Sequence, residues 1–401
     1  MSWDTFKLSD CCVSITDGDH LPPPKADSGI PFVTISNINT INQFDFTNTM
    51  FVPQDYYDKL DSKRKAQIGD VLYSVVGSFG IPVYIKDNRQ FVFQRHIAIL
   101  RPNEKILPRF LYYTMLSRDF YAKADAVAVG AAQRTVGLTS LRNIKIDVPT
   151  IDEQNKIVNI LSVYDELIEN NQKQIKLLEE AAQRLYKEWF VDIRFPGHEN
   201  TPIVDGVPQG WSIRKLETFG DIITGKTPST ANDSYYNGNI PFVKIPDMHN
   251  TIYPIITEIT LSEEGANTQK NKFVPKNSIM VSCIATVGLV NIAVQECQTN
   301  QQINSIVLDD LHDLYYLYFS TKGLKMLLDG VGSNGATMTN VNKSKFANIE
   351  ILCPPVELRD QFYDFCKPIF EKILILSKSI IDLKNSRDQI LPKLMSGEIE
   401  V

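Results

Sequence analysis

Gly29-Ile30-Pro31-Phe32-Val33-Thr34-Ile35 is the stretch that decides the fold, because it returns later in the chain as Asn239-Ile240-Pro241-Phe242-Val243-Lys244-Ile245. Further matches follow in the same order: Leu72-Tyr73-Ser74 with Met280-Val281-Ser282, Phe110-Leu111-Tyr112-Tyr113 with Tyr316-Leu317-Tyr318-Phe319, and Val148-Pro149 with Cys353-Pro354. The offset between partners drifts only from about 210 to about 205 residues, and self-similarity at a fixed spacing indicates a repeated architecture. The sequence therefore predicts one duplication that spans most of the chain.

Each half begins with short strand-like runs and ends in helical patterns. Residues 30–35, 71–75 and 91–100 are apolar runs bounded by Gly, Pro, Asn and Asp, which is typical of strands. A short helical pattern follows at residues 108–116 in the first half and 311–328 in the second. We expect an α+β fold: two pseudo-repeated domains of helices and short strands, separated by two long antiparallel coiled-coil helices.

Apolar residues at alternating spacings of three and four mark the end of each half. The predicted coiled-coil positions are Ile157, Leu161, Ile168, Ile175, Leu178 and Leu185 in the first helix and Ile369, Ile373, Leu376, Ile380 and Leu383 in the second. Such stripes predict a helix pair. Asn171 and Arg387 interrupt them, and a polar residue at such a position can fix the register. Pro368 is expected to kink the second helix. Two ordinary amphipathic helices, each on its own domain, stay an alternative.

Two turns rich in Pro and Gly, Phe195-Pro196-Gly197 and Val207-Pro208-Gln209-Gly210, mark a linker between the halves. The predicted domains are therefore residues 1–150, a first helix at 151–194, the linker at 195–210, a second domain at 211–353, and a second helix at 354–401.

Charge and cysteine usage limit the class of protein. The 401 residues carry a net charge of −6, which argues mildly against a nucleic-acid protein, although residues 1–150 hold slightly more basic than acidic side chains. A partner is therefore expected to supply part of any grip on phosphates. The six cysteines form no C-x-x-C pair and suit no zinc site, which fits a reducing cytoplasm. We expect no leader peptide and no membrane span.

Gly220-Asp221-Ile222-Ile223-Thr224-Gly225-Lys226-Thr227 matches the phosphate-binding P-loop pattern letter for letter. A working P-loop needs a helix directly after it, whose N-terminus faces the phosphate. Here Pro228 and Ser229 begin a loop-like stretch instead, and the first half has no lysine at the matching place. A nucleotide-hydrolysing enzyme is an alternative, but a loop that places Lys226 near a DNA phosphate is the preferred interpretation.

Other catalytic signatures are missing from the sequence. An adenine methyltransferase would need an Asn/Asp-Pro-Pro-aromatic motif, and Cys353-Pro354-Pro355-Val356 lacks the amide or acid. Neither G-x-S-x-G nor H-E-x-x-H occurs. We therefore predict no catalytic residue and no metal ligand in this chain.

Polar loops at equivalent places in the two halves carry side chains of the types that can read base edges. Arg pairs with guanine, and Gln or Asn pairs with adenine. The candidate DNA-binding residues are Lys25, Ser78, Arg95, Gln133, Arg134, Lys226, Thr227, Ser229, Gln301, Gln302, Thr339 and Asn340. The alternative for any one of them is that it only satisfies the backbone of a turn.

Several stretches together resemble the specificity subunits of bacterial type I restriction–modification systems. They are Val148-Pro149-Thr150-Ile151-Asp152-Glu153-Gln154, Trp189-Phe190-Val191-Asp192-Ile193-Arg194-Phe195-Pro196-Gly197, Ile223-Thr224-Gly225-Lys226-Thr227-Pro228-Ser229 and Leu391-Pro392-Lys393-Leu394-Met395-Ser396-Gly397-Glu398-Ile399. The second helix departs from the family's pattern, because Pro355-Val356-Glu357-Leu358-Arg359 replaces the Asp-Glu-Gln entry.

The resemblance implies a non-catalytic, sequence-specific subunit whose two target-recognition domains each read one half of a bipartite site in double-stranded DNA. It implies two modification subunits that methylate adenine N6 and restriction subunits that cleave DNA. It also implies that S-adenosylmethionine, Mg²⁺ and ATP bind those partners and not this chain. In the family, the helix pair fixes the distance between the half-sites. A coiled-coil scaffold that binds only proteins is a further alternative.

Overall fold

The computed structural model describes the whole chain except residues 1–2, 48, 132, 326–327 and 329–340. The chain divides into two compact units. The first comprises residues 1–170 and 380–401, and the second comprises residues 171–379. Among the described residues, no helix combines the length and the apolar character that crossing a bilayer requires.

Within its described residues, the first unit contains three sheets. A four-stranded antiparallel sheet has the order β2-β8-β5-β6, a three-stranded sheet has the order β4-β3-β7, and β1 pairs with β9. In the three-stranded sheet, β3 runs parallel to β7 and antiparallel to β4. The strands are β1 Asp4–Lys7, β2 Cys12–Asp17, β3 Ile30–Val33, β4 Met50–Val52, β5 Val71–Ser74, β6 Pro82–Tyr84, β7 Val92–Phe93, β8 Ile97–Pro102 and β9 Lys145–Val148.

The second unit repeats this topology strand for strand. Its sheets have the orders β13-β19-β16-β17, β15-β14-β18 and β12-β20, and β14 is again parallel to its last neighbour, β18. The strands are β12 Ser212–Lys215, β13 Gly220–Thr224, β14 Tyr236–Val243, β15 Ile259–Leu261, β16 Ile279–Ser282, β17 Val290–Ile292, β18 Gln298–Thr299, β19 Ile303–Leu308 and β20 Glu350–Cys353. A small hairpin of β10 (Ile203–Val204) and β11 (Val207–Pro208) precedes them. The predicted duplication is thus confirmed.

One predicted strand is wrong in a way that matters for the site. The apolar run at residues 91–100 is not one strand but two, β7 and β8, which belong to different sheets. Residues 94–96 form the turn between them, because the chain leaves the three-stranded sheet there and enters the four-stranded one.

Short helices cover the sheets. In the first unit they are α1 (Gln54–Lys59), α2 (Pro108–Leu116), α3 (Arg118–Ala126) and α4 (Leu138–Asn143). In the second they are α6 (Ile245–Met248), α7 (Glu263–Asn267), α8 (Leu314–Gly323) and α10 (Lys343–Ala347). The helical pattern at residues 108–116 predicts α2 correctly. Six of the nine residues of α2 and eight of the ten residues of α8 are buried, so each helix lies inside its unit, between a sheet and a long helix.

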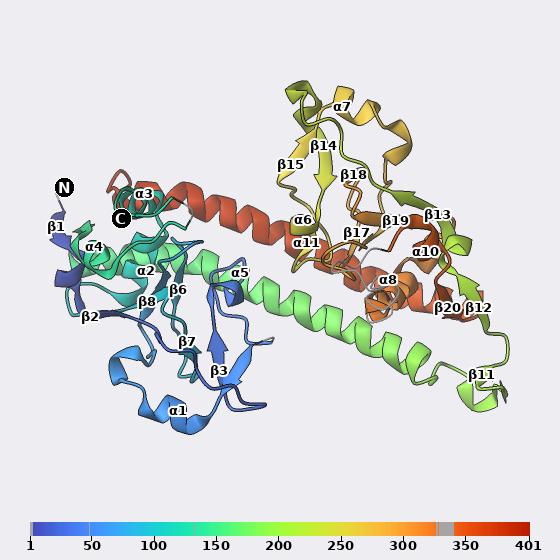
Figure 1. Ribbon diagram of the computed structural model, residues 1–401, viewed down its shortest axis with the longest axis horizontal. Helices are drawn as coiled ribbons and strands as arrows, with labels where there is room; N and C mark the ends of the chain where they lie inside the picture. The colour runs from blue at the N-terminus through green and yellow to red at the C-terminus, as the bar shows by residue number, and fades with distance from the viewer. Residues whose placement is uncertain (1–2, 48, 132, 326–327, 329–340) are drawn as a thin grey trace. The chain divides into compact units, whose positions relative to one another are not determined.

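Two long helices, α5 (Ile151–Tyr186) and α11 (Val356–Met395), each contribute one segment to both units (Figure 1). Their segments pack antiparallel in each unit. In the first, Asp165 contacts Arg387, whereas Lys156 donates to the carbonyl of Val401 at 2.8 Å. In the second, Asn171 donates to Ser379 at 3.1 Å. The predicted α+β fold with a paired set of long helices is therefore confirmed, and α11 continues through Pro368.

The predicted coiled-coil residues are all buried or half-buried on these helices. Ile157, Leu161, Ile168, Ile373 and Leu376 are buried, and Ile175, Leu178, Leu185, Ile369, Ile380 and Leu383 are half-buried. The interrupting residues are buried as well, and both are paired: Asn171 with Ser379, and Arg387 with Asp165 at 2.7 Å. The compact units do not coincide with the predicted domain ranges, because each unit includes parts of both helices.

The start of α5 explains the Asp-Glu-Gln entry. Glu153 accepts hydrogen bonds from the backbone and hydroxyl of Thr150, which is the reciprocal contact of a capping box. Gln154 is fully buried, accepts from the backbone N–H of Leu107 at 2.7 Å, and donates to two backbone carbonyls. It therefore ties the long helix to the entry of α2.

Arg359 occupies the matching place on α11. It is buried and forms an ion pair with Asp313, which immediately precedes α8 as Leu107 precedes α2. Burial lowers the pKa of the Arg359 guanidinium, and the nearby Arg214 adds to this effect. The departure from the family's entry motif thus replaces a neutral amide contact with a buried ion pair.

Candidate nucleic-acid interface

In the first unit, backbone hydrogen bonds hold four loop segments side by side. We call these segments, residues 17–20, 75–80, 94–96 and 133–136, the first loop surface. The connecting bonds are Gly18 N to Ile97 O (3.1 Å), Asp19 N to Phe93 O (2.8 Å), Val75 N to His96 O (2.8 Å), Gly77 N to Arg134 O (2.9 Å) and Val136 N to Val75 O (2.9 Å). Segments far apart in sequence are therefore linked into one continuous surface by main-chain hydrogen bonds.

The second unit contains the same frame. The second loop surface comprises residues 224–229, 283–288, 300–302 and 341. Its connecting bonds are Gly225 N to Ile303 O (3.1 Å), Lys226 N to Thr299 O (2.9 Å), Cys283 N to Gln302 O (2.8 Å) and Val341 N to Cys283 O (2.9 Å). Each of these bonds has a counterpart of nearly equal length in the first loop surface. The duplication has therefore preserved the main-chain geometry of the loops although their side chains differ.

A glycine is required at the centre of each frame. A side-chain carbon on Gly18 would lie 2.2 Å from the carbonyl oxygen of Phe93, and one on Gly225 would lie 2.2 Å from that of Asn300. Real side-chain carbons do not approach backbone oxygens so closely. The first segment of each surface can therefore lie against the turn that precedes β8 or β19 only because glycine has no side chain.

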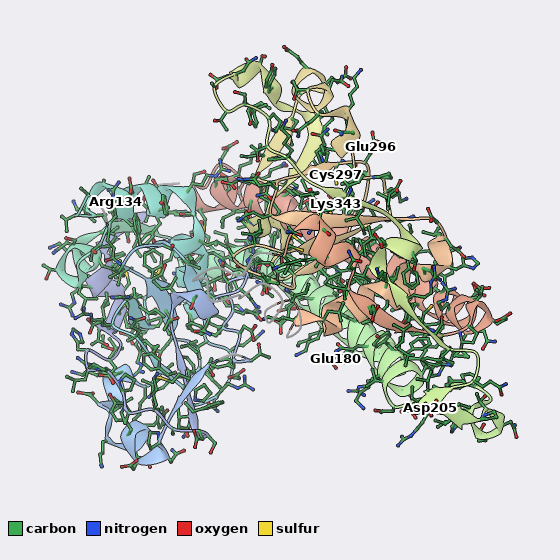
Figure 2. All side chains as sticks on the ribbon, turned by 45° about the vertical axis from the view of Figure 1, so that its right-hand side comes forward. Arg134, Glu180, Asp205, Glu296, Cys297 and Lys343 are labelled. Atoms are coloured by element: carbon green, nitrogen blue, oxygen red, sulfur yellow. The ribbon has the colours of Figure 1, made fainter. Side chains whose placement is uncertain are left out.

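The candidate residues of the first half lie exposed on or beside the first loop surface. Ser78, Arg95 and Gln133 project from its segments, and Lys25 follows the first segment. Arg134 is exposed too (Figure 2), but its guanidinium already contacts Asp125 at 2.9 Å and lies 6.0 Å from the centre of the Phe79 ring. Arg134 is therefore held in place before any ligand arrives.

The candidate residues of the second half that the structure describes lie together on the second loop surface. Lys226, Ser229 and Gln301 are exposed, and Thr227 donates to the side-chain oxygen of Gln301 at 2.8 Å. Gln302 is half-buried beside them. Thr339 and Asn340 lie outside the described residues.

The P-loop interpretation does not survive the geometry. Residues 220–224 form strand β13, and the two amides that would cradle a phosphate, those of Gly225 and Lys226, already donate to Ile303 and Thr299. Thr227 begins no helix, since the next helical turn is Asp233–Tyr235. The side chain of Lys226 is exposed and makes no ion pair with another described residue.

Sequence reasoning missed a buried polar network behind the second loop surface. Gln269 donates to the carbonyl of Lys226 at 2.6 Å and contacts Gln298, whose amide donates to Ala266. Asn304 accepts from Thr224 and donates to the carbonyl of Val341. The first half has Val92 and Ala98 at the places of Gln298 and Asn304, so the comparison of the two halves would have revealed this difference.

A second feature that sequence reasoning missed is a basic turn beside each loop surface. Ser62–Arg64 in the first unit and Lys270–Lys272 in the second are equivalent one-turn helices. Thr16, at the end of β2, donates to the carbonyl of Lys63 at 3.0 Å, and Gln269, just before Lys270, donates to Lys226. Lys63 and Lys270 are exposed, and neither forms an ion pair with a described residue.

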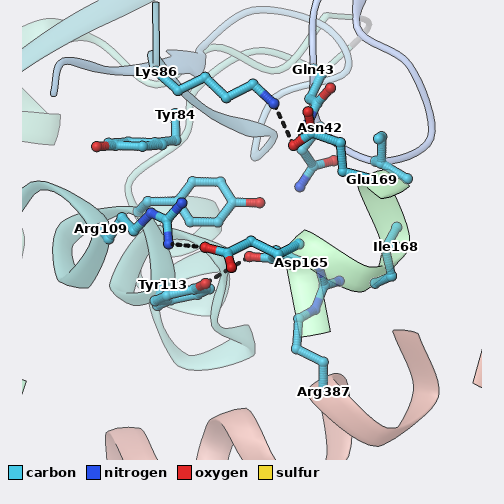
Figure 3. Close-up of a pocket in the computed structure, with 13 residues that line it drawn as sticks. Asn42, Gln43, Tyr84, Lys86, Arg109, Tyr113, Asp165, Ile168, Glu169 and Arg387 are labelled. Carbon is cyan, nitrogen blue, oxygen red and sulfur yellow. Dashed lines mark hydrogen bonds and ion pairs between the residues drawn. The ribbon is translucent and has the colours of Figure 1, made fainter. Parts of the chain in front are cut away.

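The charged side chains that line a polar pocket in the first unit are paired with one another, which indicates a structural role (Figure 3). Arg109 on α2 contacts Glu166 at 2.9 Å, Lys86 contacts Glu169, and Arg387 contacts Asp165, which also accepts from Tyr113 at 2.7 Å. Burial and the neighbouring Asp165 raise the pKa of Tyr113. Each cation here is matched by a carboxylate of α5, so the pocket joins the domain to the helix.

Side chains typical of metal or thiol chemistry are not arranged for it within the described part of the chain. No group of three or more His, Cys, Asp or Glu residues there could hold a metal ion. Burial raises the pKa of the Cys283 thiol to about 11 and that of Cys297 to about 12, although hydrogen bonding from Asn304 lowers the former. These thiols are therefore poor nucleophiles at neutral pH.

The comparisons with known proteins agree on one family. The model of the type I restriction modification DNA specificity domain matches twice, at residues 2–180 and 208–385. The chain is 32% identical to the Type I restriction enzyme HindI specificity subunit of Haemophilus influenzae, over 92% of this chain and 95% of the relative. It is 26% identical to the putative MjaX specificity subunit of Methanocaldococcus jannaschii, over 100% and 94%.

A solved structure supports the same fold. The crystal structure of the type I restriction–modification S subunit from M. genitalium aligns with a TM-score of 0.57 at 15% identity, over 98% of this chain and 96% of that one. Together with the repeated topology and the two loop surfaces, these matches show that the chain belongs to the family of type I restriction–modification specificity subunits, with two copies of the specificity domain.

Proposed function

We propose that each loop surface reads one half of a bipartite target in double-stranded DNA. The observation that carries this proposal is the common main-chain frame, which holds different polar side chains in the two halves. Arg95 and Gln133 in the first half, and Gln301 and Gln302 in the second, are the side-chain types that hydrogen-bond to base edges in the major groove. The two loop surfaces share a backbone frame but differ in their exposed side chains. They therefore suit two half-sites of different sequence.

The reaction itself would belong to partner subunits. Two modification subunits would methylate adenine N6, and restriction subunits would cleave DNA, with S-adenosylmethionine, Mg²⁺ and ATP bound to those partners. The flipped adenine would then enter a pocket that another chain supplies. This chain would act in the cytoplasm as a non-catalytic subunit, and its paired helices would set the length of the unspecified spacer.

Exchanging residues 1–150 for the same region of a relative is expected to change one half of the target and leave the other intact. The physical reason is that the described backbone bonds of the second loop surface join residues between 225 and 341 to one another. The measurement is genome-wide mapping of methylated adenines in a host that carries the chimera and its modification subunit. A change in both halves would contradict the assignment of one surface to one half-site.

The chimera needs a matched control, because α2 contacts the retained helix. Arg109 and Tyr113 bind Glu166 and Asp165 on α5, so a donor with other residues at these two places would lose both contacts. A second chimera that keeps Arg109 and Tyr113 separates a folding defect from a change in DNA reading. The exchange of residues 211–353 should alter the other half of the target.

The basic turns are proposed to contact phosphates on either side of the base-reading loops. Replacing Lys63 or Lys270 with glutamine is expected to reduce the slope of log affinity against log salt by about 0.9 for each lost phosphate contact. The recognised sequence should stay the same, because phosphates carry no base information. Fluorescence anisotropy of a target duplex with the subunit–methyltransferase complex, over a range of salt concentrations, measures this slope.

Lys145→Gln is the control for the loss of one positive charge, since Lys145 is exposed on β9 and belongs to neither loop surface. Its slope should equal that of the parent complex. If Lys63→Gln and Lys270→Gln behaved like Lys145→Gln, the basic turns would not contact DNA.

A further inference from the structure

Asn300 and Gln302 form a closed pair in the turn between β18 and β19. The backbone N–H of Gln302 donates to the side-chain oxygen of Asn300 at 3.1 Å, and the side-chain nitrogen of Asn300 donates to the side-chain oxygen of Gln302 at 2.9 Å. The main chain beneath the pair is fixed as well, because Asn300 N donates to Val243 and Gln302 O accepts from Cys283. Only Gln302 can reach a ligand, since it is half-exposed whereas Asn300 is buried.

These bonds determine which way each amide faces. A backbone N–H can only donate, so the atom of Asn300 that meets it must be the oxygen. The other end of the Asn300 amide is then a nitrogen, which can only donate, so it must meet the oxygen of Gln302. The Gln302 amide is therefore left with its nitrogen free to donate to a ligand.

The first loop surface has no such pair. Gln94 and His96 stand at the places of Asn300 and Gln302, and among the described residues no hydrogen bond joins their side chains. The contact that orients Gln302 is therefore present in the second loop surface and not among the described residues of the first. Such a difference is expected if the two domains read different bases.

We propose that Asn300 is a positioning residue that turns the nitrogen of Gln302 toward DNA, so that the second domain selects a keto base at one position of its half-site. This inference rests on the proposed function. At the exocyclic position that this nitrogen would meet in the major groove, guanine and thymine present the acceptors O6 and O4, whereas adenine and cytosine present amino donors; the N7 acceptor is common to both purines and does not discriminate between them. An amino group opposite the Gln302 nitrogen would place two donors against each other, and a wrong base at a contacted position costs about 1–3 kcal/mol.

Asn300→Asp tests the orientation directly. Aspartate keeps the acceptor for the backbone of Gln302 but cannot donate, so the Gln302 amide must turn over and present its oxygen instead. We expect preference at one base pair of the second half-site to invert from keto to amino bases, by about tenfold or more, which corresponds to roughly 1.4 kcal/mol. The readouts are adenine-methylation mapping with the modification subunit of the same host, and binding to duplexes in which each base of the second half-site is varied.

Three further variants make the result specific. Gln302→Glu also presents only oxygen and should shift the same base pair in the same direction. Asn300→Ala frees the amide to turn either way and should reduce discrimination without inverting it. Asn267→Asp adds the same charge at an exposed position on α7, outside both loop surfaces and both basic turns, and should leave the preference unchanged. The first half-site is the internal control in every case.

The outcomes separate the two proposals. Two results would overturn the role of Asn300. One is a parent target whose second half-site has amino bases at every specified position of the contacted strand. The other is an unchanged base preference in folded Asn300→Asp. A parent complex that methylates no two-part sequence would overturn the proposed function itself, and this inference with it.

Discussion

Replacing Arg359 with leucine is expected to lower the free energy of unfolding by about 3–5 kcal/mol, because the change leaves Asp313 buried and without its cation. Arg359 also lies 5.9 Å from the centre of the Phe219 ring, so its loss removes a packing contact in the same core. The ion pair joins the start of α11 to the entry of α8, and the damage should therefore be concentrated in the second unit. Urea denaturation of the purified chain, followed by circular dichroism, measures the effect.

The double variant Arg359→Leu with Asp313→Leu supplies the control. Removing both charges leaves no unpaired ion, and apolar replacement of a buried pair is often neutral or stabilising. The first half already carries Leu107 at the place of Asp313. The double variant should recover most of the lost stability, whereas Asp313→Leu alone should be nearly as damaging as Arg359→Leu. A single variant within about 1 kcal/mol of the parent would show that the pair contributes little.

Alkaline pH is expected to unfold the protein between about pH 10 and pH 12. Burial raises the pKa of Tyr315, Tyr316 and Tyr318 on α8 above the ordinary value of 10, so they stay protonated in the folded chain while they ionise in the unfolded one. The folded state then binds more protons, and stability falls as pH rises. Each such tyrosine contributes a loss of about 1.36 kcal/mol per pH unit above its unfolded pKa. By pH 12 the three together remove about 8 kcal/mol, comparable to the whole stability of a domain.

Absorbance of the phenolate at alkaline pH, recorded beside circular dichroism, tests this coupling. The part of the absorbance change that comes from the buried tyrosines should coincide with the loss of the helical signal, because these tyrosines ionise only on unfolding. Tyr315→Phe is the matched variant: its ring contacts with Tyr363 and Phe370 do not require the hydroxyl, so the alkaline midpoint should rise. Ionisation of all tyrosines near pH 10 with the helical signal intact would contradict the prediction.

The duplication and the long helices could be predicted because they depend on patterns within the sequence. Matched apolar stretches recur in order, and the heptad positions repeat over many turns. The pattern therefore indicates which side chains become buried. The run at residues 91–100 misled for the opposite reason. Hydrophobicity alone cannot tell that the chain changes sheets at residues 94–96, since both strands on either side are buried.

The sequence placed the candidate residues in polar loops, and the structure gathers those that it describes on or beside the two loop surfaces; that they contact DNA stays a prediction. Glutamines and arginines in turns indicate base reading, yet the orientation of Gln302 depends on a single contact with Asn300, two residues away. Likewise, the role of Arg359 depends on Asp313, which is distant in sequence. Such pairs are decided by the geometry of a folded turn or helix entry. A closer comparison of the two halves would still have pointed to Gln298 and Asn304, which replace Val92 and Ala98.

The frame that joins the loop segments is made of main-chain atoms, and Gly18 and Gly225 lie where its segments approach each other too closely for a side chain. Mutation or recombination can therefore exchange the exposed residues without disturbing the bonds that place them. If the loop surfaces read DNA as proposed, a few codon changes would alter the recognised sequence while the frame stays the same. The main-chain scaffold would be kept while its exposed side chains change. The two halves of this chain already differ in this way, because their backbone bonds match and their loop residues do not.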